Sequence, residues 1–166
     1  MTERRSTEPV VDLKQRLPPK DHPTTLSIIV PAFNERATIA AILRRVLAVE
    51  IPLEKELIIV DDASTDGTRG LLLELEGQTQ KTSAVRMKLV LQGKNQGKGA
   101  AIRAGLRQAT GDLVLIQDAD REYDPRDYGL PLELFLDGRA DVVFGTRFHG
   151  GTHRRLTFGT PWQIDG

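Results

Sequence analysis

The sequence predicts a doubly wound α/β domain, in which a mostly parallel sheet carries helices on both faces. Short apolar segments alternate along the chain with segments whose apolar residues recur at helical spacing. The apolar segments are continuous, as in strands that are buried on both faces of a parallel sheet. Because crossovers between parallel strands are right-handed, this alternation of strands and helices favours helices on both sides of one sheet.

The expected elements follow one another from residue 26. The second helix is expected to begin at a cap from Ser64 or Thr65, or from Asp66, and the fourth at Pro125 after Asp124, since proline suits the first helical position. The predicted strands are 26–30, 57–60, 85–91, 113–116 and 141–145, and the predicted helices are 39–47, the region around 71–75, 97–109 and 125–136.

The composition favours one soluble domain and excludes several kinds of site. A chain of 166 residues is long enough for a single core. Lysine plus arginine equals aspartate plus glutamate at 23 each, so no global charge attracts nucleic acid. The absence of cysteine excludes disulfides, zinc thiolates and a cysteine nucleophile. Because no apolar run is long enough to span a bilayer and no signal-peptide core is present, we expect a cytoplasmic location.

Acidic residues follow three of the predicted strands. The segments 31–35, 61–67 and 118–122 each come directly after an apolar run. In a doubly wound sheet, ligands bind at the carboxyl ends of the strands, near the point where the strand order reverses. Carboxylates brought together there are costly unless a cation neutralises them, and Mg²⁺ or Mn²⁺ with oxygen ligands is the simple candidate. The alternative is a solvated loop whose acids only cap the next helix.

The last of these segments has a spacing that suits a metal ion. Asp118, Asp120 and Glu122 are two residues apart, so in extended backbone their side chains point to one side. The three histidines of the chain lack the spacing of metal ligands. We therefore expect an all-oxygen metal site at the end of the fourth strand.

Other residues at these strand ends suit a nucleotide. Phe33 follows the first strand, and its ring either packs in the core or stacks on a nucleobase, with Asp61 or Asp62 accepting from base or ribose. Lys98 lies in a glycine-rich loop that matches neither a Walker loop nor a dinucleotide fingerprint, and it either meets a phosphate or is solvated. Arg147 ends the fifth strand, where an arginine can bind a diphosphate bidentately.

Six strings of the sequence, taken in order, match one known family. They are residues 30–35 (Val-Pro-Ala-Phe-Asn-Glu), 59–68 (Ile-Val-Asp-Asp-Ala-Ser-Thr-Asp-Gly-Thr), 97–101 (Gly-Lys-Gly-Ala-Ala), 111–112 (Gly-Asp), 118–120 (Asp-Ala-Asp) and 141–147 (Asp-Val-Val-Phe-Gly-Thr-Arg). Together they resemble family-2 glycosyltransferases, and within these the dolichol- or polyprenyl-phosphate mannose and glucose synthases. The resemblance implies the GT-A fold, whose sheet binds a nucleoside-diphosphate sugar together with Mg²⁺ or Mn²⁺.

The resemblance also implies roles for the site residues. Phe33 occupies a position that usually holds a tyrosine beside the base, and Glu35 would contact base or ribose with the aspartate pair. Asp118 would face the ribose and the sugar, while Asp120 and Glu122 would hold the metal. The expected catalytic residues are accordingly Asp118 and Asp120. The residues expected to bind the nucleotide sugar are Pro31, Phe33, Glu35, Asp61, Asp62, Lys98, Asp118 and Arg147.

The match to the family pattern is incomplete in three places. Ala63 replaces a usual glycine, and Arg121 replaces a usual leucine. The resemblance then fades beyond residue 148, where the family continues with a segment that binds the acceptor. We therefore expect a disordered leader over 1–25, a nucleotide-sugar-binding domain over 26–148, and a truncated or divergent tail over 149–166.

The expected reaction is transfer of a sugar from a GDP- or UDP-linked donor to an acceptor, which by the resemblance is a polyprenyl phosphate. Such an acceptor implies a protein peripheral to a membrane surface. The metal would stabilise charge on the leaving diphosphate. Two alternatives stay open: a truncated module that binds the donor without turnover, and a metal-dependent nucleotidyltransferase. The latter typically carries a glycine-rich basic loop after its first strand, where this sequence has the acidic segment 31–35.

Overall fold

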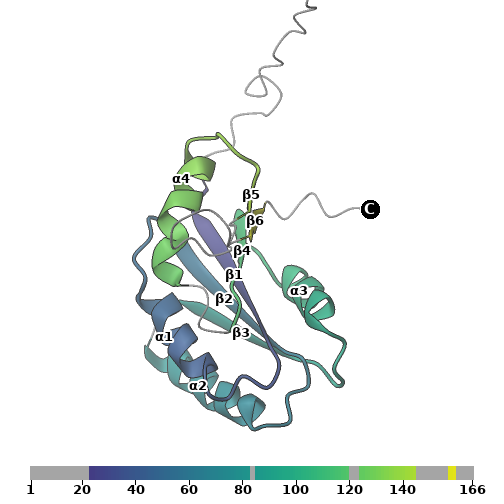
Figure 1. The fold of residues 1–166 in the computed structure, drawn as a ribbon. Helices are drawn as coiled ribbons and strands as arrows, with labels where there is room; N and C mark the ends of the chain where they lie inside the picture. Colours follow the sequence, from purple (N-terminus) through teal and green to yellow (C-terminus); the bar gives the residue numbers. More distant parts are fainter. Residues whose placement is uncertain (1–22, 83–84, 120–123, 145–156, 160–166) are drawn as a thin grey trace, which may run out of the picture.

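The structure is a computed structural model and describes residues 23–82, 85–119, 124–144 and 157–159. Strands and helices alternate up to residue 144, and all described strands lie in one sheet (Figure 1). The strands are β1 (Thr25–Ala32), β2 (Glu54–Asp61), β3 (Arg86–Leu91), β4 (Leu113–Ile116), β5 (Val142–Phe144) and β6 (Thr157–Gly159). The helices are α1 (Ile39–Ala48), α2 (Thr68–Thr82), α3 (Lys98–Leu106) and α4 (Gly129–Leu136), the last preceded by a 3-10 helix (Pro125–Tyr128).

The sheet has the strand order β3-β2-β1-β4-β6-β5. β1 pairs in parallel with β2 and with β4, and β2 pairs in parallel with β3. β6 is antiparallel to both of its neighbours, β4 and β5. The chain thus builds from β1 to β3 and then continues on the other side of β1, so the strand order reverses between β1 and β4. This confirms the predicted doubly wound, mostly parallel fold.

Helices cover both faces of the sheet, and alternate residues of the strands pack against them. α1, α2 and α4 lie on one face, whereas α3 lies on the other (Figure 1). On β1, Ile28 and Val30 belong to the larger core cluster with α1, while Ile29 packs on the α3 side beside Ala101. A Cβ added to Gly105 would lie 2.5 Å from Cγ2 of Ile29, so this glycine lets α3 lie directly on β1.

The amino-terminal half of β2 carries a buried carboxylate, that of Glu56. Its Oε2 accepts from the Ser27 hydroxyl at 2.6 Å and from the Thr110 N–H at 2.8 Å. Its Oε1 accepts from Lys88 Nζ at 2.8 Å and from the Thr110 hydroxyl at 2.9 Å. Burial works to raise the pKa of Glu56, but the hydrogen bonds from Lys88, Ser27 and Thr110 outweigh it and lower the pKa to about 2. The carboxylate is therefore ionised and satisfied by four donors.

The start of α2 differs from one of the two expectations. α2 begins at Thr68, so the prediction that Ser64 or Thr65 caps it is wrong. The Ser64 hydroxyl accepts from the Asn34 N–H at 3.0 Å, and the Thr65 N–H donates to Asn34 Oδ1 at 2.8 Å. Asp66 serves the helix start instead, because its carboxylate accepts from the Thr68 N–H at 3.0 Å. Ser64 and Thr65 join two loops because Asn34, two residues after β1, is close enough to bond to them.

The sheet also uses residues on both sides of the range 26–148. Thr157–Gly159, which lie in the segment expected as a divergent tail, form β6 and pair with β4. At the other end, β1 begins at Thr25, and the Thr24 N–H donates to Asp112 Oδ2 at 2.8 Å. The residues 23–25 of the expected leader are thus part of the described structure, while residues 1–22 lie outside it.

Candidate functional site

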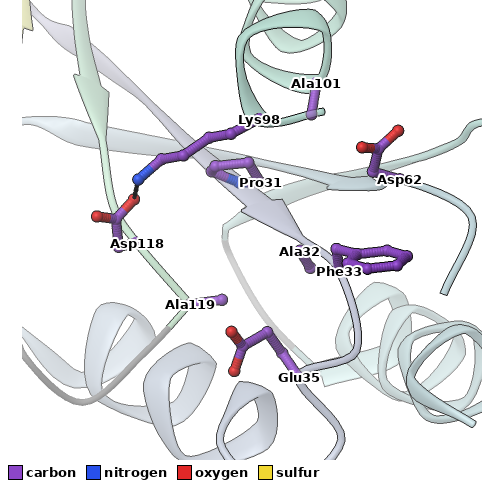
Figure 2. A pocket seen from close by; sticks show the side chains of 9 residues that line it. All are labelled: Pro31, Ala32, Phe33, Glu35, Asp62, Lys98, Ala101, Asp118 and Ala119. Atoms are coloured by element: carbon purple, nitrogen blue, oxygen red, sulfur yellow. Dashed lines mark ion pairs between the residues drawn. The ribbon is translucent and has the colours of Figure 1, made fainter. Parts of the chain in front are cut away.

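A pocket lies at the carboxyl ends of the strands, beside the point where the strand order reverses. Its walls come from the ends of β1, β2 and β4 and from the first turns of α3 (Figure 2). Ligands of doubly wound sheets bind at this place. Six of the residues expected to bind a nucleotide sugar line it together. The nine lining residues are Pro31, Ala32, Phe33, Glu35, Asp62, Lys98, Ala101, Asp118 and Ala119.

The loop after β1 is held in place by the loop after β2. The Glu35 N–H donates to the Thr68 hydroxyl at 2.9 Å, and the Glu35 carboxylate accepts from the Thr38 hydroxyl. Asn34, which bonds to the second loop, has a φ of 56°, and Ala63 in that loop has a φ of 60°. A glycine adopts such a conformation without steric cost, so the alanine at position 63 carries backbone strain.

Phe33 lies at the rim of the pocket rather than in the core. It follows the last residue of β1 and is 44% exposed, whereas its neighbour Ala32 is 2% exposed. In Figure 2 its ring stands beside Ala32 at the end of β1. The structure therefore disfavours the alternative that Phe33 is a core residue, and leaves a ring face available to a ligand.

The two neighbouring aspartates after β2 have different surroundings. Asp61 is fully buried and its Oδ2 accepts from Arg69 Nε at 2.7 Å, so the structure does not bring it to the pocket. Asp62 lines the pocket, and its two carboxylate oxygens accept from the Gln96 N–H at 2.9 Å and the Gly97 N–H at 2.7 Å. Asp62 thereby holds the glycine-rich loop in front of α3. Its neighbour Asp61 orients Arg69 instead.

Lys98 is the first residue of α3 and forms an ion pair with Asp118. Figure 2 shows the Lys98 side chain extending from α3 toward the Asp118 carboxylate, with the ion pair as a dashed line. The Lys98 side chain is 59% exposed and that of Asp118 is 19% exposed. The lysine is therefore neither buried nor simply solvated, since a carboxylate of the same pocket holds it.

Two residues that were not predicted from the sequence, Gln117 and Tyr128, hold the backbone that carries Asp118. Gln117 is fully buried, and its Nε2 donates to the Asp118 carbonyl at 2.9 Å. Its Oε1 accepts from the Tyr128 hydroxyl at 2.7 Å, and burial raises the pKa of this tyrosine. Ala119 is 4% exposed, belongs to the core cluster and lines the pocket together with Asp118. A polar Gln117 at the end of a buried strand was the available signal.

Three expected site residues, Asp120, Glu122 and Arg147, lie outside the described residues. Within the ranges that the structure describes, histidine and acidic side chains form no group of three or more that could hold a metal ion. The metal ligands and the arginine for the diphosphate therefore remain predictions from the sequence.

The fold and the pocket together define the class of this protein. Its doubly wound sheet matches the fold of solved GT-A glycosyltransferases, and its pocket lies at the strand reversal, where such sheets bind ligands. Residues 27–162 match the family model described as glycosyl transferase family 2. The chain belongs to this family. The match extends beyond β6, in agreement with the place of that strand in the sheet.

Two curated relatives illustrate the branch of the family. The chain is 34% identical over 132 residues to the undecaprenyl-phosphate 4-deoxy-4-formamido-L-arabinose transferase of Aeromonas hydrophila, covering 78% of this chain and 37% of the relative. It is 36% identical over 124 residues to the dodecaprenyl-phosphate galacturonate synthase of Rhizobium johnstonii, covering 74% of this chain and 36% of the relative. The chain thus spans little more than a third of these relatives' length.

Solved structures show the same fold. The mannosyltransferase PcManGT from Pyrobaculum calidifontis, in complex with GDP-Man and Mn²⁺, has a TM-score of 0.53 and 33% identity, covering 61% of this chain and 29% of that one. S. aureus TarS in complex with UDP-GlcNAc has a TM-score of 0.60 and 27% identity, covering 77% and 37%. In the described part of the chain, no helix has the length and apolar character to cross a membrane.

Proposed function

We propose that this chain forms the donor-binding part of a glycosyltransferase that moves a sugar from a nucleoside diphosphate to a polyprenyl phosphate. The observation that carries the proposal is the pocket at the strand reversal, which brings together Phe33, Asp62, Lys98 and Asp118 from four separate segments. The names of the curated relatives support the acceptor, since both act on a polyprenyl phosphate. The nucleotide sugars bound to the structural neighbours support the donor.

The pocket suggests how the donor lies. The ring of Phe33 would stack on the nucleobase, and the carboxylates of Glu35 and Asp62 would meet the base and ribose. Asp118 would face the ribose and the sugar, and the ammonium of Lys98 would meet the diphosphate together with Arg147. Asp61, which is buried against Arg69, would act on the donor only through the position of that arginine.

The divalent cation would be held by Asp120 and Glu122, which follow Asp118 along the chain. The residues fit such an ion, because Asp118 presents a carboxylate in the pocket and the segment supplies hard oxygen donors without nitrogen or sulfur. When bound, Mg²⁺ or Mn²⁺ stabilises the charge that develops on the leaving diphosphate. The complex of PcManGT with Mn²⁺ supports this choice of ion.

The acceptor would supply its own nucleophile. A phosphate monoester with a second pKa of about 6 is largely dianionic at pH 7, so its oxygen needs little help from a base. The protein's contribution would then be to place this oxygen beside the anomeric carbon, since positioning supplies much of the rate.

Calorimetry with UDP- and GDP-sugars, with and without Mn²⁺, tests the donor site. We expect binding that depends on Mn²⁺, and we expect Asp120→Ala to weaken it about tenfold or more, equivalent to about 1.4 kcal/mol. Asp137→Ala is the control, because Asp137 lies beyond α4 on the surface and away from the pocket. An Asp120→Ala variant with wild-type affinity in Mn²⁺ would refute the metal assignment.

Transfer itself is measured with a radiolabelled donor sugar and polyprenyl phosphate in detergent. Lipid-linked product that requires Mn²⁺ supports the transferase. Donor binding without product would support the alternative of a module that binds the nucleotide sugar without turnover.

A further inference from the structure

The Lys98–Asp118 ion pair joins two residues that the proposed function assigns to the donor. Lys98 belongs to α3 on one face of the sheet, and Asp118 follows β4 within it. Both line the pocket, and their charged groups meet across it (Figure 2). In the proposed function the lysine binds the diphosphate of the donor, and the aspartate binds its ribose and sugar. The ion pair must therefore separate before both groups can bind the donor.

Lys98 has a special place among the charged residues of the pocket. The carboxylate of Asp62 accepts two backbone N–H groups, and that of Glu35 accepts the Thr38 hydroxyl. Among the described residues that line the pocket, Lys98 is the one cation, and it forms an ion pair with Asp118. A carboxylate next to further acids needs a positive charge nearby, and in the structure the ammonium group supplies it.

The two partners differ in their freedom to move. The backbone of Asp118 is held by Gln117, which is bonded to the buried Tyr128. The side chain of Lys98 is 59% exposed and reaches the carboxylate through a flexible stem of four carbons. Separation of the pair therefore requires a rotation of the lysine side chain and no movement of the sheet.

We propose that Lys98, through its ion pair with Asp118, competes with the divalent cation. The diphosphate of the donor ends this competition by drawing Lys98 away from Asp118. Without the donor, the ammonium neutralises Asp118. When the donor enters, Lys98 moves to the diphosphate and the cation takes over the neutralisation of the acidic strand end. The inference rests on the proposed function and adds that Lys98 couples the binding of the cation to that of the diphosphate.

The test is Lys98→Gln, which keeps a polar side chain and removes the charge. Mn²⁺ binding without nucleotide, measured by electron paramagnetic resonance, should become about three- to tenfold tighter, in keeping with the loss of a partly exposed competing charge. UDP and GDP binding at saturating Mn²⁺, measured by calorimetry, should become weaker because the diphosphate loses a cation. The factor by which UDP or GDP strengthens Mn²⁺ binding should therefore shrink.

Two matched variants serve as controls. Lys94→Gln removes the same charge from the loop before α3, at a residue that does not line the pocket, and should change neither affinity. Lys98→Arg keeps a cation beside Asp118 and should keep the weak binding of Mn²⁺ alone. Circular dichroism verifies that each variant is folded.

The outcomes separate the inference from the proposed function. A Lys98→Gln variant that binds Mn²⁺ no more tightly than the wild type overturns the competition by Lys98. So does an equal gain in Lys94→Gln, because the effect would then be one of net charge. A wild-type protein that binds neither UDP nor GDP in Mn²⁺ refutes the proposed donor site, while the measurements with Mn²⁺ alone still decide the role of the ion pair.

Discussion

Two carboxylates at opposite ends of the sheet strands are bonded differently. The Glu56 carboxylate, in the amino-terminal half of β2, accepts four hydrogen bonds. The Asp118 carboxylate, beyond the carboxyl end of β4, has Lys98 as its partner in the described structure. Glu56 is fully buried, while Asp118 is partly exposed in a pocket. Both carboxylates are paired with a lysine of a neighbouring element. The difference lies in how much of their hydrogen-bonding capacity the protein itself fills. A filled carboxylate stabilises the fold, and a partly filled one is available to a ligand.

The largest expected effect is the loss of stability when the Glu56 carboxylate is removed. Glu56→Ala leaves the donors of Ser27 and Thr110 without their acceptor and Lys88 without its counter-charge, at a cost of about 3–5 kcal/mol in the free energy of unfolding. Urea denaturation measures this loss. A cost below about 1 kcal/mol, the size of a surface ion pair, would show that the two sites differ less than their geometry indicates.

Lowering the pH should destabilise the fold through the same carboxylate, that of Glu56. The folded-state pKa of Glu56 is about 2 and its reference value is 4.5, so its contribution is complete above pH 4.5 and is lost as the pH falls toward 2. The shift corresponds to about 3 kcal/mol. Glu56→Gln should remove this part of the pH dependence. Asp124, whose pKa Arg126 lowers to about 2, remains in both proteins, so the difference between their stability curves isolates Glu56. Parallel curves would contradict the assignment.

At the pocket, a substitution should affect binding rather than folding. Phe33→Ala removes an exposed ring, and the loss of a stacked base is expected to weaken nucleotide binding by about 1–3 kcal/mol. Phe33→Tyr should bind as well as the wild type. Calorimetry and urea denaturation on the same samples separate the two effects. If Phe33→Ala instead destabilises the fold by the 3–5 kcal/mol or so that is typical of a core phenylalanine, the ring is structural.

The smallest expected effect concerns the loop after β2. Ala63 has a φ of 60°, which costs an alanine about 1–2 kcal/mol, while glycine adds back some entropy to the unfolded chain. Ala63→Gly should therefore raise the free energy of unfolding by at most about 1 kcal/mol. Thermal denaturation measures the change. A decrease would show that the surrounding hydrogen bonds already compensate the strain at this position.

Much of the fold could be predicted from the sequence because the central strands are continuous apolar runs. The run 113–116 coincides with β4, and the runs 26–30 and 57–60 lie inside β1 and β2. β6 could not be predicted, since a strand of three residues shows no period and owes its existence to an unpaired edge of β4. The strand propensity of a short segment is a weak predictor where pairing with a distant strand decides whether the strand forms.

The site could be predicted as a set of strand ends but not as a set of contacts. Asp61 and Asp62 are adjacent and chemically alike, and what separates them is that Arg69 reaches one while the loop before α3 reaches the other. The ion pair between Lys98 and Asp118 likewise depends on α3 packing on β1, the strand that pairs with β4. These contacts follow from packing between distant segments, which a single sequence does not display.

The position of β6 between β4 and β5 has a consequence for biosynthesis. The ribosome releases β1 to β4 in an order that lets each parallel strand pair as soon as its crossover helix has formed. β5 emerges next, but among the described strands its partner is β6, which is translated after it. Among the described strands, the four-stranded sheet β3-β2-β1-β4 can therefore form before β6 is translated, while the edge of β4 that β6 covers is unpaired and β5 lacks its partner. During that stage the exposed edge of β4 is a pairing site for other chains.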